Sequence, residues 1–272
     1  MATEIEFGVR SDTGCVRENN EDSYRVAPEL NLFVLSDGMG GLDAGEVASR
    51  LAVDTVIAHC REAEMNSSLP LAGDKIAGAS PASNRLASAI RLANDAVRNA
   101  AQKSEAPKGM GATIVAARLT DERMSLAHVG DSRAYRLRGG DFEQLTHDHS
   151  FVAEEVRRGR MTQDEANSSH MQSVLIRALG IEPQVDVDVM EERFMEGDTV
   201  LLCSDGLTRE LSDAQIAAVL QESADAQKAV ARLVDLAKQA GGGDNVTAIV
   251  LRRAAKPTGA FGRLGKWFKN SA

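Results

Sequence analysis

The order in which strand-like and helix-like segments follow one another constrains this fold more than any other feature. Longer amphipathic stretches predict helices at residues 45–64, 83–103, 150–158, 213–222 and 226–240. Short apolar or alternating runs bounded by Gly, Asp or Asn predict strands at residues 5–9, 24–27, 32–35, 113–118, 124–129, 134–137, 185–189, 199–203 and 246–251. Strands and helices do not alternate regularly, which argues against a doubly wound parallel sheet. We therefore expect an α+β fold with antiparallel sheets.

The charge balance limits the classes of partner. The chain of 272 residues has 31 basic and 40 acidic side chains, a net charge of -9, and 43% hydrophobic residues. These values fit a folded protein of one large or two small domains. A chain this acidic is a poor non-specific binder of nucleic acid, because phosphate contacts require a basic surface. The six basic residues and no acid at 252–272 leave the preceding part more acidic still, and metal binding is one reason for such an excess of carboxylates.

Cysteine usage and hydropathy indicate a cytoplasmic location. The three cysteines, Cys15, Cys60 and Cys203, include no pair with C-x-x-C spacing, and their odd number argues against a disulfide framework. The first ten residues lack the basic and apolar regions of a secretory signal. No apolar run approaches the roughly 18 residues that a membrane-spanning helix needs.

One short pattern occurs twice, far apart in the chain. Residues 32–38 and residues 200–206 each form an apolar strand that ends in Ser-Asp-Gly. Two further aspartates, Asp131 and Asp244, lie beside glycines at the ends of other predicted strands. Each Asp alone is most simply a turn residue. If the four strand ends converge, however, Asp37, Asp131, Asp205 and Asp244 form an all-oxygen site.

An all-oxygen site of this kind suits Mg²⁺ or Mn²⁺ rather than zinc. Two such ions a few ångströms apart can hold a bridging hydroxide and clamp a phosphoryl oxygen. An anion-binding partner lies in the loop of residues 14–22, where Arg17 can present two N–H groups to a phosphate. Taken alone, Arg17 is more simply a surface ion-pair residue.

Taken together and in order, these motifs resemble the metal-dependent serine/threonine protein phosphatases of the type 2C family, in their bacterial form. The resemblance spans about residues 8 to 251. Each motif is weak alone, but their joint occurrence is specific. The matching segments are residues 16–23, 36–41, 45–49, 109–113, 128–135, 145–150, 177–180, 202–207 and 243–247.

The resemblance implies a fold and a set of site residues. The fold would be a central antiparallel β-sandwich flanked by pairs of antiparallel helices, formed by residues 1–254 with a mobile flap at about 147–180. Asp37 would bridge two metal ions, the Gly38 carbonyl would bind one of them, and Asp205 and Asp244 would complete the second site. Asp131, with Asp205, would bind a weaker third ion.

The resemblance also implies a substrate and a type of reaction. By the same resemblance, Arg17 would bind the substrate phosphate, and Glu21 and Asp22 would hold metal-bound water or support the ligand shell. The reaction would be hydrolysis of phosphoserine and phosphothreonine in proteins, such as a serine/threonine kinase or its substrates, by a monomeric enzyme. Met39 stands where eukaryotic relatives carry a histidine proposed as general acid, so the leaving-group acid is unassigned.

Three other interpretations agree less well with the sequence. Residues 203–209 fit C-x-x-G-x-x-R, the loop of cysteine-dependent phosphatases, with Cys203 as nucleophile and Arg209 as phosphate ligand. Asp205 inside that loop would repel both a thiolate and a phosphate. A pseudophosphatase that acts as a binding module would require a damaged site, yet the matched carboxylates and Arg17 are present. His147 and His149 alone are too few ligands for a zinc site.

The C-terminal residues 255–272 are interpreted as a flexible basic tail. Apolar residues at 261, 264, 267 and 268 alternate with basic ones, which would allow contact with an anionic membrane surface. Gly262 and Gly265 weaken any helix there, so a disordered terminus is favoured.

Overall fold

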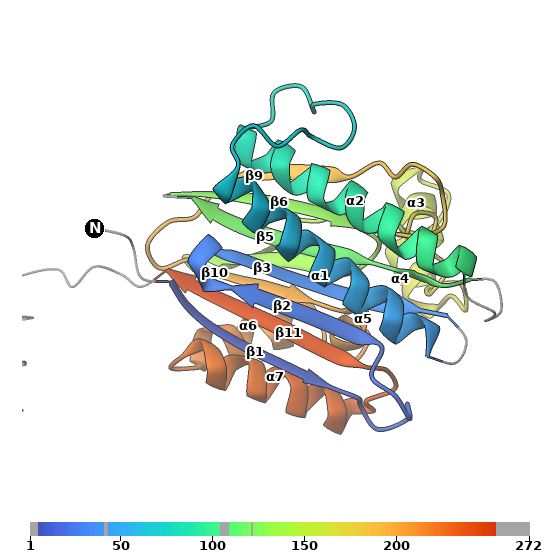
Figure 1. The fold of residues 1–272 in the computed structure, drawn as a ribbon. Coiled ribbons are helices and arrows are strands. Elements are labelled where there is room, and N and C mark those ends of the chain that lie inside the picture. The colour runs from blue at the N-terminus through green and yellow to red at the C-terminus, as the bar shows by residue number, and fades with distance from the viewer. Residues whose placement is uncertain (1–4, 41–42, 104–108, 121, 254–272) are drawn as a thin grey trace, which may run out of the picture.

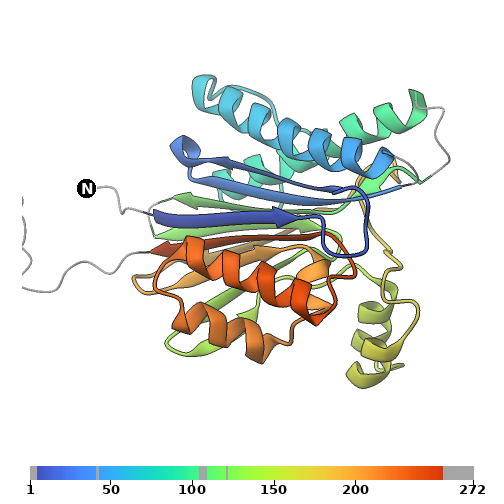
Figure 2. The same cartoon turned by 90° about the horizontal axis from the view of Figure 1, so that it is seen from below.

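Two antiparallel β-sheets lie face to face between two layers of helices (Figures 1 and 2). The computed structural model describes residues 5–40, 43–103, 109–120 and 122–253. The predicted α+β sandwich is therefore confirmed. The predicted basic tail, residues 255–272, lies outside the described residues.

The first sheet has the strand order β1-β11-β10-β7-β8, and every neighbouring pair in it is antiparallel. Its strands come from both ends and the middle of the chain, so this sheet is held together by contacts between distant segments. The strands are β1 (Ile5–Asp12), β7 (Arg133–Arg138), β8 (Asp141–Gln144), β10 (Thr199–Cys203) and β11 (Val246–Arg253).

The second sheet has the order β2-β3-β5-β6-β9, with the two-residue strand β4 paired to the end of β3. A 3₁₀ turn at Pro28–Leu30 connects β2 to β3. The strands are β2 (Asp22–Ala27), β3 (Leu32–Met39), β4 (Gly111–Ala112), β5 (Ile114–Thr120), β6 (Arg123–Val129) and β9 (Asp188–Arg193).

Helices cover the outer face of each sheet. The long pair α1 (Ala44–Met65) and α2 (Pro81–Lys103) covers the second sheet, and α6 (Asp213–Glu222) with α7 (Ala226–Ala240) covers the first. Side chains fix where these helices begin: Ser212 and Gln215 form a capping box on α6, and Asp225 caps α7. Three short helices lie near one end of the sandwich: α3 (Phe151–Arg157), α4 (Gln163–Ser168) and α5 (Asp205–Thr208).

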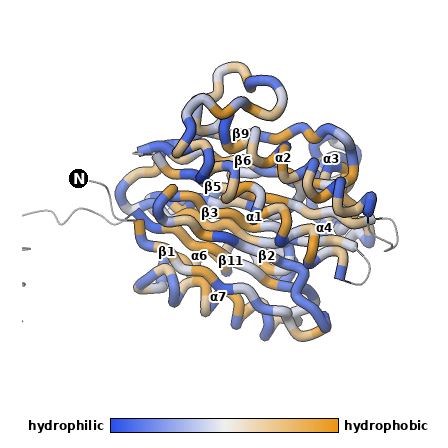
Figure 3. The backbone as a smooth tube through the Cα atoms, viewed as in Figure 1, coloured by the Kyte–Doolittle hydropathy of each residue, from blue (hydrophilic) through white to orange (hydrophobic). Residues whose placement is uncertain are grey.

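The core has three apolar layers, and single strands contribute to two of them. In β3, Leu32 and Val34 pack under α1 and α2, whereas Phe33 and Leu35 pack between the sheets. This follows from the alternation of side chains along a strand. Because both faces are covered, the strand is apolar throughout rather than alternating. Figure 3 shows hydrophobic residues concentrated along these central strands.

Most predicted elements are confirmed, with three kinds of error. The strand predicted at 185–189 lies at Asp188–Arg193, because Val185 and Val187 pack against the helix layer before pairing with β6 begins. β3 does not end before Ser36 but continues to Met39, paired with β2 and β4. The short elements β4, β8, α4 and α5 were not predicted, because their stability comes from tertiary contacts. No helix in the described part is long and apolar enough to cross a membrane.

Candidate metal centre

Side-chain alternation explains why polar residues gather at one end of the space between the sheets. Phe33 and Leu35 face this space, so Asp37, two residues further along β3, faces it too. The same alternation brings Asp22 in β2 and Thr247 in β11 to the same end, because each shares a strand face with residues that pack between the sheets. The apolar layer therefore ends in a polar cluster.

Asp22 and Asp37 are paired across β2 and β3. Asp22 is buried, and its Oδ2 accepts hydrogen bonds from the Ser204 and Thr247 hydroxyls at 2.8 and 2.7 Å. The backbone of Asp37 is held by Thr113, whose Oγ1 accepts the Asp37 N–H at 3.0 Å and whose N–H donates to the Asp37 carbonyl at 2.8 Å. These bonds fix two carboxylates on a rigid sheet.

Three more aspartates reach the cluster from the ends of strands. Asp131 lies in the turn between β6 and β7 and is buried. Asp205 begins α5 directly after β10, and Asp244 lies in the loop before β11. Asp37 and Asp205 are close enough to share a side-chain hydrogen bond, which requires a proton on one of them. The four aspartates predicted to converge, and Asp22 with them, thus share one cluster.

Burial and mutual repulsion disfavour ionisation of these acids. Burial raises the pKa of Asp22 to about 7 and that of Asp131 to about 8, and the charge of Asp205 adds to both. Burial also raises the pKa of Asp37 well above its ordinary value, and the charges of the four neighbouring aspartates add to the shift. So many carboxylates in one place require compensating positive charge.

Two arginines and one glutamate border the cluster. Arg17 Nη2 lies 2.9 Å from Asp244 Oδ2. Arg209 forms ion pairs with Asp205 and, at 3.5 Å, with Asp244. Glu21 accepts a hydrogen bond from the Gly45 amide at the start of α1, and burial raises the pKa of Glu21. Every residue predicted from the sequence for the site therefore lies at or beside this cluster.

Asn245 connects the loop that carries Arg17 to the loop that carries Asp244. Its side-chain amide donates to the carbonyls of Thr13 and Asn19 at 3.0 and 2.9 Å and accepts the Glu21 N–H at 2.8 Å. Sequence reasoning assigned no role to Asn245, or to the hydroxyl residues around Asp22 and Asp37. The alternation of buried side chains along β10 and β11 was the signal that could have found Ser204 and Thr247.

The cluster fits a divalent cation. Asp22 Oδ1 and Asp205 Oδ1 are buried and have no hydrogen-bond partner among the described residues. Leaving such an atom unpaired is costly, and a bound cation would remove that cost. Because the acids at the centre of the cluster offer carboxylate oxygens and no imidazole or thiolate, their chemistry suits Mg²⁺ or Mn²⁺.

A cavity of about 1090 Å³ opens beside the cluster. Asp131 and Asp205 lie in its wall, and residues of α3, α4 and the start of α6 are part of the lining. The cavity is thus as large as the ligand-binding clefts of proteins, which enclose roughly 300–1,000 Å³.

Cys203 does not have the surroundings of a nucleophile. Its side chain packs in the helix-side core, fully buried, and burial raises the pKa of its thiol to about 12. A reactive cysteine needs a lowered pKa and exposure to the substrate. Arg209, the phosphate ligand of that alternative, is instead paired with Asp205.

Comparisons with known proteins place the chain in a family. Residues 16–241 match the model of the family described as protein phosphatase 2C, so the chain belongs to that family. It is 40% identical to the serine/threonine protein phosphatase PstP of Mycobacterium tuberculosis over 90% of this chain and 44% of PstP. The chain thus spans less than half of the length of PstP.

Two further similarities cover whole proteins or whole domains. The chain is 33% identical to the serine/threonine phosphatase Stp of Listeria innocua, over 90% of this chain and 94% of Stp. The catalytic domain of PstP, solved in complex with two manganese ions, superposes with a TM-score of 0.74 and 38% identity, over 92% of this chain and 99% of that domain.

Proposed function

We propose that this protein is a metal-dependent protein phosphatase that hydrolyses phosphoserine and phosphothreonine. The observation that carries the proposal is the cluster of five aspartates beside a large cavity, in which Asp22 and Asp205 each have a buried oxygen without a hydrogen-bond partner among the described residues. The serine/threonine phosphatase names of its relatives support the substrate class. The two manganese ions in the PstP domain support the cofactor.

The resemblance to the type 2C phosphatases assigns a role to each acid. Asp37, held on two sides by strands, would bridge two ions, with the Gly38 carbonyl on one of them and Asp205 and Asp244 on the other. Asp131, with Asp205, would hold a weaker third. When bound, Mn²⁺ or Mg²⁺ neutralises charge on phosphoryl oxygens and lowers the pKa of water. Two hydroxyls hold one oxygen of Asp22. Asp22 would therefore support Asp37 and would not bind an ion by itself.

Arg17 would bind the phosphate. Its side chain is half exposed and next to Asp244, so its planar guanidinium can turn two N–H groups to a phosphoryl group beside the acids. Glu21 lies between Arg17 and the start of α1 and would hold water at the edge of the cluster. The residue that protonates the leaving group is not assigned, because Met39 cannot donate a proton.

The proposal extends to domain organisation and partners. Residues 1–254 would form the phosphatase domain, and the segment 147–180, which carries α3 and α4, would act as a flap over the cavity. The substrates would be phosphorylated proteins, such as a serine/threonine kinase or its targets. Comparing the phosphoproteomes of cells with and without this protein would identify them.

The direct test is hydrolysis of a phosphothreonine peptide by the purified chain. We expect activity with Mn²⁺, none in excess chelator, and recovery when Mn²⁺ is restored. Arg17→Ala should raise KM with a smaller effect on kcat. Arg25→Ala is the matched control, because Arg25 forms a comparable exposed ion pair with Asp54 on β2 and α1. Full activity in chelator would contradict the proposal, and an unchanged KM would remove Arg17 from it.

A further inference from the structure

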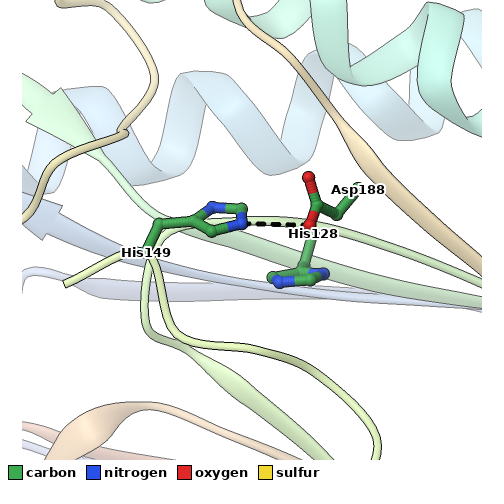
Figure 4. A group of neighbouring side chains, drawn as sticks. All are labelled: His128, His149 and Asp188. Atoms are coloured by element: carbon green, nitrogen blue, oxygen red, sulfur yellow. Dashed lines mark ion pairs between the residues drawn. The ribbon is translucent and has the colours of Figure 1, made fainter. Parts of the chain in front are cut away.

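His149 occupies a junction between the acidic cluster and the segment 147–180. Its imidazole is buried, stacks on that of His128 at 4.7 Å between ring centroids, and points toward Asp188 on β9 (Figure 4). None of these three residues belongs to the cluster of aspartates. They nevertheless connect the turn that carries Asp131 to the base of this segment.

On one side, His149 is bonded twice to Gly130, the residue before Asp131. The His149 N–H donates to the Gly130 carbonyl at 3.0 Å, and the Gly130 N–H donates to His149 Nδ1 at 3.1 Å. Because a donor and an acceptor of His149 both bind Gly130, His149 fixes the position of the peptide groups of Gly130. The turn of residues 130–132 is thus located by a side chain outside it.

On the other side, His149 is anchored to β9. Because Nδ1 accepts a hydrogen bond, the proton of the neutral ring lies on Nε2, which faces Asp188 Oδ2 at 3.3 Å. Arg177 binds the second oxygen of Asp188 at 2.5 Å. The hydrogen bond from His149 and the charge of Arg177 lower the pKa of Asp188, so this anchor stays ionised.

These contacts argue against a metal site formed by His128, His149 and Asp188. The Arg177 guanidinium lies 3.1 Å from His149 Nε2 and already neutralises Asp188. The His128 Nε2–H group donates a hydrogen bond to the His147 carbonyl at 2.9 Å. A cation in that place would have to displace Arg177 and break these bonds.

His149 also connects the two ends of the segment. Its carbonyl accepts the Ile176 N–H at 2.9 Å, next to a second backbone bond from Phe151 to Val174 at 2.8 Å. We infer that His149 is a positioning residue, which sets the place of Asp131 and couples it to the base of the flap. The inference rests on the proposed function, in which Asp131 is a metal ligand.

The test separates the Gly130 contact from simple packing. In His149→Ala the acceptor for the Gly130 N–H is lost, whereas in His149→Asn the side-chain oxygen can replace Nδ1. His147→Ala is the matched control, because His147 lies two residues away and is exposed. Two quantities are measured: hydrogen exchange of the Gly130 amide by NMR in chelator, and Mn²⁺ affinity by calorimetry.

In His149→Ala we expect Gly130 exchange at least about tenfold faster, and about tenfold weaker binding of the lowest-affinity Mn²⁺, the effect typical of a lost supporting contact. The tighter Mn²⁺ sites should be unchanged, and His149→Asn and His147→Ala should match the wild type. Unchanged exchange in His149→Ala, or equal damage in His149→Asn, would overturn the inference.

If His149→Ala does not fold, His149→Asn is compared with His149→Gln, which reaches toward Asp188 but does not return the acceptor to Gly130. The inference then requires slower Gly130 exchange in the Asn variant. If the wild type neither binds Mn²⁺ nor hydrolyses phosphopeptides, the proposed function fails, whereas the Gly130 exchange still decides whether His149 positions the turn.

Discussion

The two Ser-Asp-Gly runs have nearly the same sequence pattern but different structures. In residues 32–38 the strand β3 continues through the motif, so Asp37 stands on the sheet beside Asp22. In residues 200–206 the strand β10 stops at Cys203, and Asp205 begins the short helix α5. A shared local sequence therefore does not imply a shared local structure.

The cause is that the two runs sit with opposite faces toward the space between the sheets. Leu35 faces that space, whereas Cys203, at the corresponding position, faces the helix layer. A strand that continued past Cys203 would carry Asp205 to the helix side, since alternate residues share a face. Leaving the strand lets Asp205 reach the acids. The two corresponding aspartates, Asp37 and Asp205, thus reach one site by different routes.

The glycines of the two runs, in contrast, serve one purpose. A Cβ on Gly38 would lie 2.0 Å from the Gly45 carbonyl oxygen, and a Cβ on Gly206 would lie 2.0 Å from that of Asn245. In both runs another backbone segment passes directly over the glycine. The glycines are therefore needed because two backbone segments approach closely, whereas the strand register determines where each aspartate points.

The comparison is tested most severely by removing each aspartate's charge. Asp37→Asn and Asp205→Asn should both lower kcat in Mn²⁺ by several orders of magnitude, because each removes a ligand charge from the cluster despite its different backbone setting. Phosphopeptide hydrolysis by folded, purified variants measures this. Near-normal turnover in either variant would show that the two runs do not serve one site.

The glycines provide a second, structural test. Gly38→Ala and Gly206→Ala should both lower the thermal midpoint strongly, because the new methyl group meets backbone in each case. Gly139→Ala is the control: nothing lies near it, so it carries the strain of its φ of 59° alone. Equal midpoints for all three variants would refute the close-approach explanation.

A third test uses pH, in the presence of chelator. An acid whose pKa is higher in the folded chain holds its proton more tightly there, so its contribution to stability falls as pH rises from about 4 toward 8. For Asp131, with a folded-state pKa of about 8, Asp131→Asn should match the wild type near pH 4. Near pH 8 the variant should melt higher, by about 3 °C or more. A difference in thermal midpoint between Asp131→Asn and the wild type that does not change with pH would contradict the explanation by a buried charge.

The smallest effect on activity is expected at Cys203, where the second run has a thiol and the first run has Leu35. Cys203→Ser should leave turnover near normal, because the thiol is buried, faces away from the acids and has a raised pKa. The cost is the burial of a hydroxyl, about 1–3 kcal/mol of folding free energy. Iodoacetamide should likewise inactivate little. Loss of activity in Cys203→Ser with Asp205→Asn active would restore the cysteine alternative.

The sequence predicted the helices and strands better than it predicted the contacts between them. Apolar runs and amphipathic stretches predicted Thr199–Cys203 and the helices α6 and α7 with their observed bounds. The fold itself followed from segment order and from the resemblance. The strand register did not follow from either of these. The orientation of Asp37 and the departure of Asp205 from β10 therefore could not be predicted.

Contacts between distant segments could not be predicted from the sequence either. Ser204 and Thr247 bind Asp22 because three strands of two sheets meet there, and Asn245 joins loops that are more than two hundred residues apart in the chain. The role of His149 depends on a pairing with Gly130 that no local pattern encodes. Motifs predicted which residue types matter, whereas packing determined which supporting residues hold them.

The pairing of β1 with β11 has a consequence for the timing of synthesis. Ile5–Asp12 finds its hydrogen-bonding partner in Val246–Arg253, and Asp244 and Asn245 immediately precede that last strand. At translation rates of about 5–20 residues per second, a nascent chain waits roughly 10 to 50 s between making the first strand and making its partner. Such long-range pairing also slows folding. The first sheet therefore cannot be completed until Arg253 has been made, and a chain that is cut off before Val246 should never form it.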